Sequence, residues 1–356
     1  MLSKMKDWQK SQQRWEAFWH QEIVDRPLIS ASSRLNEDIS SILVPANNEI
    51  RWLDEDFRIK EAIWDIEHTY YAADGFPMIN TSIGPGTLAV YLGAQPEFGE
   101  DTVWYHKSID DISNVQIPKL DLENKYWQDT LRLLKKSKEQ LAGKALLGIP
   151  DLIENIDVIS SMVGNVETLF ALMECPEKIH EFQKAILPLY FEYYDRILDI
   201  IAEDDGGVAF SHFGVYAKGR MAKVQCDFSA MISSEMFGEF VSPYLKEQCD
   251  KLDYSLYHWD GLNALQHEEH LLSIRSLTGI QFTPGAGHEN PVHPRFYDLW
   301  KRVKAAGKSG MLWGTPKEIE DFAAECGARG FLLVTDFDTP EEADAFVKSS
   351  YNWNMS

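Results

Sequence analysis

The chain has 356 residues and a formal net charge of −22, with 56 acidic residues against 34 basic ones. A surface this negative repels the phosphates of nucleic acids and anionic lipids, so neither a nucleic acid nor a membrane is expected as a partner. The hydrophobic content of 44% is that of an ordinary globular protein, which at this length buries roughly three quarters of its unfolded surface.

Short apolar runs recur along the chain, each followed by a loop rich in glycine, proline and polar residues. They predict strands at Leu28–Ser32, Phe76–Thr81, Ala145–Ile149, Val208–Ser211, Ser255–His258, Gly279–Phe282, Gly310–Trp313 and Phe331–Thr335. Runs that are apolar throughout are typical of strands buried on both faces.

Amphipathic segments between these runs predict helices. Examples are Pro316–Cys326 and Pro340–Lys348, each preceded by a threonine that can cap the helix. Strands that alternate with helices, in a chain without a glycine-rich nucleotide loop, favour a closed parallel barrel over an open sheet. We therefore predict an α/β fold, a (β/α)8 TIM-type barrel of a single domain at 27–356, with an N-terminal helical segment at 1–26 packed on it.

The four cysteines are scattered without CxxC spacing, which indicates reduced thiols rather than disulfides or a structural zinc site. The segment 1–19 lacks the unbroken apolar core of a signal peptide. No window approaches the roughly 18 consecutive apolar residues of a transmembrane helix. We therefore expect a cytoplasmic protein.

Polar residues gather where the predicted strands end, which in a parallel barrel is the mouth that carries the active site. Five strand ends contribute a carboxylate or an imidazole, namely Asp151, His212, His258 with Asp260, His288 with Glu289, and Asp336. This concentration predicts a functional site at the mouth.

The sharpest motif is His258-Trp259-Asp260. Residues two apart on a strand point the same way, so the imidazole and the carboxylate share one face. That pair would hold a divalent metal or form a dyad for proton transfer; alternatively, the histidine is only hydrogen-bonded to its neighbour at the end of the barrel. Asp336 would be a third metal ligand or a helix cap, although Thr339 is the better cap.

Two further segments offer residues for substrate binding. The loop Gly285–Gly287 precedes His288 and Glu289, and it suits either a ligand against the backbone or a plain turn with solvated side chains. The segment Lys218–Asp227 is basic and is expected to form a loop at the mouth, with Asp227 in the pocket or capping the next helix. The candidate substrate-binding residues are Asp151, His212, Arg220, Gln225, His288 and Trp313.

Several short motifs occur in a characteristic order. They are Asp25-Arg26-Pro27, Gly84-Pro85-Gly86, Ser233–Phe237, Phe240–Tyr244, His258–Gly261 and Ala306-Gly307-Lys308. In this order the chain resembles the uroporphyrinogen decarboxylase superfamily, which also contains the corrinoid- and coenzyme M-linked methyltransferases. The resemblance implies a (β/α)8 barrel with its active site in the mouth, and by analogy a homodimer.

Two departures from the superfamily bear on function. The segment Leu28–Arg34 has a single arginine where the decarboxylases have several, so decarboxylation of a tetrapyrrole is not expected. The zinc methyltransferases have His-x-Cys and a further cysteine where this chain has His258, Asp260 and Asp336. One histidine and two aspartates provide harder ligand atoms than thiolates do. Such a set suits zinc but also manganese or iron(II).

We first expect a methyltransferase-like enzyme that moves a methyl group between a small substrate and a thiol or a corrinoid on a partner protein. His258, Asp260 and Asp336 would hold a divalent metal, with zinc as the first candidate. Asp227 or Glu289 would complete the site or act as base.

The second hypothesis is a lyase or decarboxylase of a small carboxylate. In it Asp260 or Asp227 donates a proton and Arg220 holds the carboxylate. The third is a ligand-binding barrel without activity. Polar strand ends argue against that one, because buried charges without a function are costly.

Overall fold

The computed structural model describes residues 2–35, 43–114, 116–353 and 355. Its strands are β1 (Leu28–Arg34), β2 (Thr69–Tyr71), β3 (Met78–Ile79), β4 (Gln95–Phe98), β5 (Val103–His106), β6 (Leu146–Leu147), β7 (Gly207–Phe210), β8 (Val215–Lys218), β9 (Met221–Gln225), β10 (Tyr254–Asp260), β11 (Gly279–Thr283), β12 (Ser309–Trp313) and β13 (Phe331–Phe337). Its α-helices are α1 (Trp8–Trp19), α2 (Asn48–Leu53), α3 (Glu55–Glu67), α4 (Thr87–Tyr91), α5 (Lys125–Leu141), α6 (Asn155–Val163), α7 (Asn165–Glu174), α8 (Pro176–Ile201), α9 (Ser234–Phe240), α10 (Ser242–Cys249), α11 (Glu268–Ser273), α12 (Tyr297–Ala305), α13 (Pro316–Cys326) and α14 (Pro340–Ser349). Short 3-10 helices are η2 (Ile112–Asn114), η3 (Asp227–Met231), η4 (Leu262–His267), η5 (Pro294–Phe296) and η6 (Ser350–Asn352).

The strands form a central sheet that is mostly parallel. Seven strands pair in the order β2-β1-β13-β12-β11-β10-β9, and all these pairs are parallel except β1 with β2. Strands β3 and β6 form a parallel pair, which a bridge between Gly148 and Ala209 extends to β7. This mixed α/β arrangement is compatible with a TIM-type barrel, although the pairing of the described residues does not close into a complete ring.

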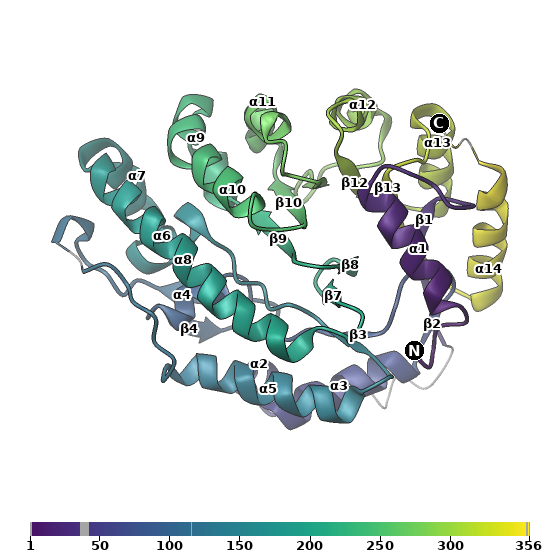
Figure 1. Cartoon of the computed structure of the whole chain (residues 1–356), viewed down its shortest axis with the longest axis horizontal. Helices are drawn as coiled ribbons and strands as arrows, with labels where there is room; N and C mark the ends of the chain where they lie inside the picture. The colour runs from purple at the N-terminus through teal and green to yellow at the C-terminus, as the bar shows by residue number, and fades with distance from the viewer. Residues whose placement is uncertain (1, 36–42, 115, 354, 356) are drawn as a thin grey trace.

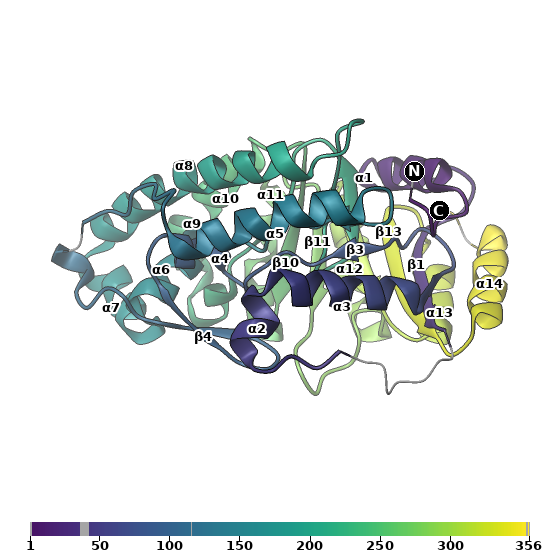
Figure 2. The same ribbon diagram turned by 90° about the horizontal axis from the view of Figure 1, so that it is seen from below.

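Helices cover the outside of the sheet. Figure 1 shows α10, α11, α12, α13 and α14 in succession around the strands, and Figure 2 shows α5 and α3 lying side by side. Under this layer the outward-facing side chains are apolar, for example Trp259 of β10 and Phe282 of β11, whose ring centres lie 5.9 Å apart. A buried outer face of this kind is expected for strands covered by helices.

All eight predicted strand positions contain a strand of the structure. The predicted helix starts are also confirmed, because Thr315 forms a capping box with Glu318 and Thr339 caps α14. One prediction was wrong. The segment Lys218–Asp227 is not a loop, because it contains β9, the last strand in the order of the seven-stranded sheet.

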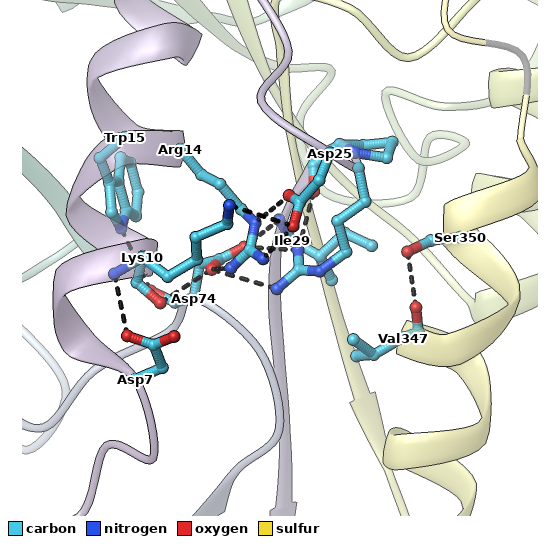
Figure 3. A network of polar contacts seen from close by, with 12 residues as sticks. Asp7, Lys10, Arg14, Trp15, Asp25, Ile29, Asp74, Val347 and Ser350 are labelled. Carbon is cyan, nitrogen blue, oxygen red and sulfur yellow. Dashed lines mark hydrogen bonds and ion pairs between the residues drawn. The ribbon is translucent and has the colours of Figure 1, made fainter.

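The N-terminal segment folds as α1 and lies at the amino ends of the strands. The hydroxyl of Ser309, the first residue of β12, donates to the carbonyl of Phe18 at 2.5 Å. A buried ion-pair network continues this contact, and Figure 3 shows Arg14 directed toward Asp25 and Asp74. Arg26 donates to the same Asp74 carboxylate at 2.6 Å. This end of the sheet is therefore closed by α1.

All four cysteines are free thiols, three of them buried. Among the described helices, none is by itself long and apolar enough to cross a membrane. Helices α6 and α7 reach the required length and composition only together, and they meet at 114°.

Candidate active site

The inner face of β9, β10 and β11 is polar. In the parallel register Gln225 lies beside His258, which lies beside Gln281. One step nearer the carboxyl ends, Asp260 lies beside Thr283. Because alternate residues of a strand point to opposite faces, these side chains all face away from the helices that cover Trp259.

Three side chains converge at the carboxyl ends of these strands. Asp227 follows β9, and His258 and Asp260 belong to β10. Each offers a ligand atom, one nitrogen and two carboxylate oxygens, and these atoms all lie within 4.8 Å of one another. We call Asp227, His258 and Asp260 the mouth cluster. The carboxylate of Asp227 is exposed and the ring of His258 is half-buried, so the cluster is open on one side.

Neighbouring amides hold the ring of His258 in one orientation. Its Nδ1 is hydrogen-bonded to Oε1 of Gln281, whose Nε2 donates to the hydroxyl of Thr283 at 3.0 Å. Burial, and next the positive charge of Lys223, lower the pKa of His258 to about 4. The ring is therefore neutral at physiological pH. With its Nδ1–H donated to Gln281, its Nε2 carries the free lone pair.

Asp227 is held by Gln225, whose Nε2 donates to its carboxylate at 2.9 Å. Although Asp227 keeps an exposed edge, desolvation of its carboxyl group by the surrounding protein raises its pKa to about 6, and the charges of Asp260 and Asp151 act in the same direction against Lys223. Like charges crowded in this way disfavour ionisation of both partners.

A second carboxyl group, that of Asp157 on α6, lies behind Asp227. It accepts the backbone N–H groups of Asp227 at 2.8 Å and of Phe228 at 2.9 Å. Burial and the neighbouring charge of Asp227 raise the pKa of Asp157 to about 7. The site thus contains two adjacent carboxyl groups that titrate near neutral pH.

One buried cation lies below the mouth cluster. The ammonium group of Lys223 pairs with Asp151 at 2.5 Å, and its side chain is only 2% exposed. The same ammonium group donates to Oε1 of Gln225, so Gln225 connects Lys223 with Asp227. A buried ion pair with these extra hydrogen bonds fixes the geometry around it.

A cavity of about 390 Å³ adjoins the mouth cluster. Asp227, Gln225 and Asp157 form its polar side. The rest of its wall includes Gly86, Trp104, Tyr105, Ile153 and Met231. Ser160, Ser161 and Asn165 add further polar groups to the wall, so a cavity of this size suits a small organic ligand that carries polar groups.

The structure brings six of the predicted site residues to this region. They are Asp151, His212, Gln225, Asp227, His258 and Asp260. His212 lies at the turn after β7, with its ring 5.0 Å from the ring of Phe213, which in turn lies 5.3 Å from that of His258. Partial desolvation, mainly, lowers the pKa of His212.

Asp336, predicted as a metal ligand, lies outside the mouth cluster. It is exposed, and its carboxylate accepts the hydroxyl of Ser32 at 2.5 Å. Its strand, β13, is three places from β10 in the sheet, with β11 and β12 between them. The carboxylate that the structure places beside His258 and Asp260 is that of Asp227, not that of Asp336.

Arg220, predicted at the mouth, lies at the opposite end of the barrel strands. It immediately precedes β9, and its guanidinium group pairs with Asp195 at 2.6 Å and packs over the ring of Tyr194. The prediction was wrong because it took this segment as a loop after a strand. Lys223 supplies the cation near the mouth cluster.

The loop after β11 does not reach the mouth cluster. Glu289 and His288 are both exposed, and the carboxylate of Glu289 pairs with Arg295 at 3.4 Å. Trp313 is the half-buried last residue of β12, two strands from β10. No hydrogen bond or ion pair of the described residues links Glu289, His288 or Trp313 to the mouth cluster. Their predicted roles, as base and in substrate binding, therefore stay predictions.

Sequence reasoning did not assign Lys223, Asp157 or Gln281 to the site. A signal was present for Lys223 and Gln225, because they alternate with apolar Ala222 and Val224 as on a strand with one polar face. For Asp157 no local signal exists. It lies on a helix, and only the fold places it behind Asp227.

No family model matches the chain, and no curated protein matches its sequence. Among solved structures, the fold is similar to that of a methyltransferase from Methanosarcina mazei, with a TM-score of 0.64 and 12% sequence identity. The similarity covers 96% of this chain and 98% of the methyltransferase. At that identity the likeness establishes a shared α/β fold.

Proposed function

We propose that the chain is a metal-dependent enzyme of the methyltransferase-like class, which transfers a methyl group between a small substrate and a thiol or a corrinoid carried by a partner protein. The observation that carries this proposal is the mouth cluster of Asp227, His258 and Asp260. The shared fold with a methyltransferase supports the class of reaction.

The mouth cluster fits a divalent ion. A metal ligand must be deprotonated, and burial keeps His258 neutral at physiological pH. Its Nδ1 is engaged by Gln281, as the second nitrogen of metal-binding histidines usually is, which leaves Nε2 for the ion. One imidazole and two carboxylates suit zinc first, and manganese or iron(II) as alternatives. A bound divalent ion acts as a Lewis acid that polarises the methyl acceptor or the leaving group.

The protein's own residues would position the substrate and move protons. The substrate would occupy the cavity beside the mouth cluster, against Trp104 and Tyr105. Asp157 lines the same cavity and has a pKa of about 7, which suits exchange of a proton with a bound thiol or leaving group. Gln225 would keep Asp227 in place through its 2.9 Å hydrogen bond.

The test is the metal content of protein purified without chelator. We expect one divalent ion per chain in the wild type, and its loss in His258→Ala, Asp260→Ala and Asp227→Ala. Asp336→Ala is the matched control, because this carboxylate lies outside the mouth cluster and should leave the metal content unchanged. A wild type that stays free of metal after reconstitution with zinc, manganese and iron(II) would exclude the proposal.

A second candidate is a lyase that acts on a small carboxylate. The observation in its favour is the pair Asp157 and Asp227, which titrate near neutral pH at the wall of the cavity. Lys223 would replace Arg220 as the cation that attracts the substrate carboxylate. The two candidates separate in one assay, because a lyase releases product without any methyl donor or partner protein.

A further inference from the structure

Behind the active site lies a small buried cavity of about 10 Å³, enclosed by α6, α8 and α10. Its polar walls are Glu154, Asn155, Gln183 and Gln248. All four residues are almost completely buried, with exposed fractions between 0% and 4%. A volume of this size holds about one water-sized particle.

The walls of this cavity carry an excess of oxygen atoms without partners. Among the described residues, no hydrogen bond of good geometry reaches Oε2 of Glu154, Oδ1 of Asn155 or the amide of Gln248, and Gln248 makes only looser polar contacts with Glu154 and Tyr190. The same holds for Oε1 of Gln183. Buried polar atoms are nearly always satisfied, so a group of four such oxygens around one cavity indicates a bound species.

Hydrogen bonds at the other ends of these side chains fix which atoms remain for the cavity. The amide nitrogen of Asn155 donates to the carbonyl of Gln225 at 2.7 Å, and that of Gln183 donates to the carbonyl of Phe240 at 2.5 Å. Oε1 of Glu154 accepts the N–H of Gln225 at 3.0 Å. The oxygens are thus the free ends, and reversing either amide would break a bond.

The number and charge of these oxygens favour a monovalent cation over other occupants. A water molecule is neutral and leaves the carboxylate charge of Glu154 uncompensated, whereas a cation balances that charge and can also be bound by the amide oxygens of Asn155 and Gln183. Carboxylate and amide oxygens are the ligands of hard cations. Glu154 is the one carboxylate among the four cavity residues, so a single positive charge balances the site.

The backbone beside Glu154 is strained. Ile153 and Asn155, on either side of it, both have φ of 51°, in the left-handed region. That conformation is unfavourable for a β-branched residue such as Ile153, and it persists only where surrounding contacts enforce it. The same segment carries Asp151, the partner of Lys223, so an ion at Glu154 would hold in place a loop of the active site.

We propose that Glu154, Asn155, Gln183 and Gln248 form a binding site for one potassium or sodium ion, which stabilises the loop at 151–155. This site is separate from the mouth cluster and does not depend on the proposed function. Without the ion, burial raises the pKa of Glu154 to about 8, so a proton would take its place.

The test compares thermal unfolding of the whole chain in potassium, sodium and tetramethylammonium chloride at equal ionic strength. We expect potassium or sodium at about a hundredfold excess over its Kd to raise the midpoint by roughly 3 °C. Glu154→Gln keeps the acceptor for the N–H of Gln225 and should lose this response. Glu320→Gln, which removes an exposed glutamate of α13, is the matched control and should keep it.

A crystal grown with thallium(I) provides a second measurement that needs no variant. We expect an anomalous peak within bonding distance of Glu154 and Gln183. Equal midpoints in the three salts together with no thallium peak would overturn the proposal, and so would stabilisation by magnesium or calcium alone. If Glu154→Gln does not fold, the thallium measurement on the wild type decides. The metal content of the mouth cluster plays no part in either result.

Discussion

Two polar networks lie at opposite ends of the parallel sheet, one before β1 and one after β9 and β10, and they differ in how their charges balance. At the amino ends, Arg14 and Arg26 meet Asp25 and Asp74, and Lys10 also pairs with Asp25 at 3.6 Å, so each carboxylate faces two cations. Asp74 is fully buried and accepts hydrogen bonds from both arginines and from Ser11. We call Arg14, Arg26, Asp25 and Asp74 the base network, and Figure 3 shows its central contacts.

At the carboxyl ends the charges are not balanced. Lys223 pairs with Asp151, whereas within the described part of the chain neither Asp227 nor Asp260 has an ion-pair partner within 4.0 Å. Crowded carboxylates of this kind reduce stability unless a proton or a metal ion neutralises them. The base network is therefore balanced by its own cations, whereas the mouth cluster has uncompensated carboxylates, as expected of a site that binds a positively charged group.

The largest effect is expected in the base network. Asp74→Ala would leave Arg14 and Arg26 buried without their shared partner, which should lower the free energy of unfolding by about 3–5 kcal/mol. Chemical denaturation measures this. Asp25→Ala is the control, because Asp25 is 29% exposed and its removal leaves the Asp74 contacts intact. Equal losses in both variants would contradict the role given to Asp74.

A smaller effect is expected next to the mouth cluster. Gln281→Leu removes the hydrogen bond to Nδ1 of His258 without touching a ligand atom. Loss of such an orienting partner should weaken metal affinity by roughly 10–100-fold. Competition with a chelating dye measures the affinity. Gln266→Leu, an exposed glutamine of η4, is the control. Unchanged affinity in Gln281→Leu would mean that Gln281 does not orient the ring.

Much of the fold was predictable because its signals are local. An apolar run identifies a strand, and a threonine before a proline identifies a helix start, whatever the rest of the chain does. Strand β9 escaped because its inner face carries Lys223 and Gln225, so it is not an apolar run. Because β9 was not predicted, Arg220 was assigned to the carboxyl ends of the strands, whereas it lies at the amino end of β9.

The site was predictable only in part, for a related reason. His258 and Asp260 share one strand, so their common face follows from the sequence. The third member depends on which strand ends lie side by side, and this is a property of the sheet order. The sequence offers Asp336 at a strand end and Asp227 in an expected loop, and only the position of β9 beside β10 selects Asp227.

The two networks should respond to pH in opposite directions. In the base network the hydrogen bond from Arg14 lowers the pKa of Asp25, so the stability from this group is lost as pH falls through the lowered value. At the mouth the pKa values of Asp227 and Asp157 are raised to about 6 and about 7, and that of Glu154 to about 8. These groups contribute to the free energy of unfolding at a pH below the pKa values they have in the unfolded chain. Their contribution is lost as the pH rises through the raised pKa values of the folded protein.

We therefore expect the free energy of unfolding, measured with chelator in tetramethylammonium buffer, to fall between about pH 6.5 and pH 8, because below this range the lowered pKa values of His258 and His212 act in the opposite direction. One proton gives a slope of at most about 1.4 kcal/mol per pH unit. Glu154→Gln should flatten the part of this curve near pH 8, because it removes the group that titrates there. The charged neighbours that act on Glu154 are Lys223 and Asp157. Glu320→Gln should not. A curve that rises over this range would contradict the directions of the shifts.

Neutralising one carboxylate of the mouth cluster should stabilise the protein when no metal is bound. Asp227→Asn keeps an acceptor for the 2.9 Å hydrogen bond from Gln225 and removes a charge beside Asp260. We expect a gain of roughly 1 kcal/mol in chelator. With the divalent ion added, the wild type should become the more stable of the two. Asp336→Asn, outside the mouth cluster, should change neither value.

The smallest effect is expected at Glu289, although the sequence made it a candidate base. Its carboxylate is exposed and meets Arg295 at 3.4 Å in solvent, where an ion pair contributes little. Glu289→Gln should therefore leave metal content, thermal midpoint and turnover unchanged, whereas Asp227→Asn alters the first two. A loss of turnover in Glu289→Gln with metal content intact would show that the loop after β11 closes over the mouth cluster during the reaction. The comparison between the two ends of the strands would then have to include that loop as a part of the site.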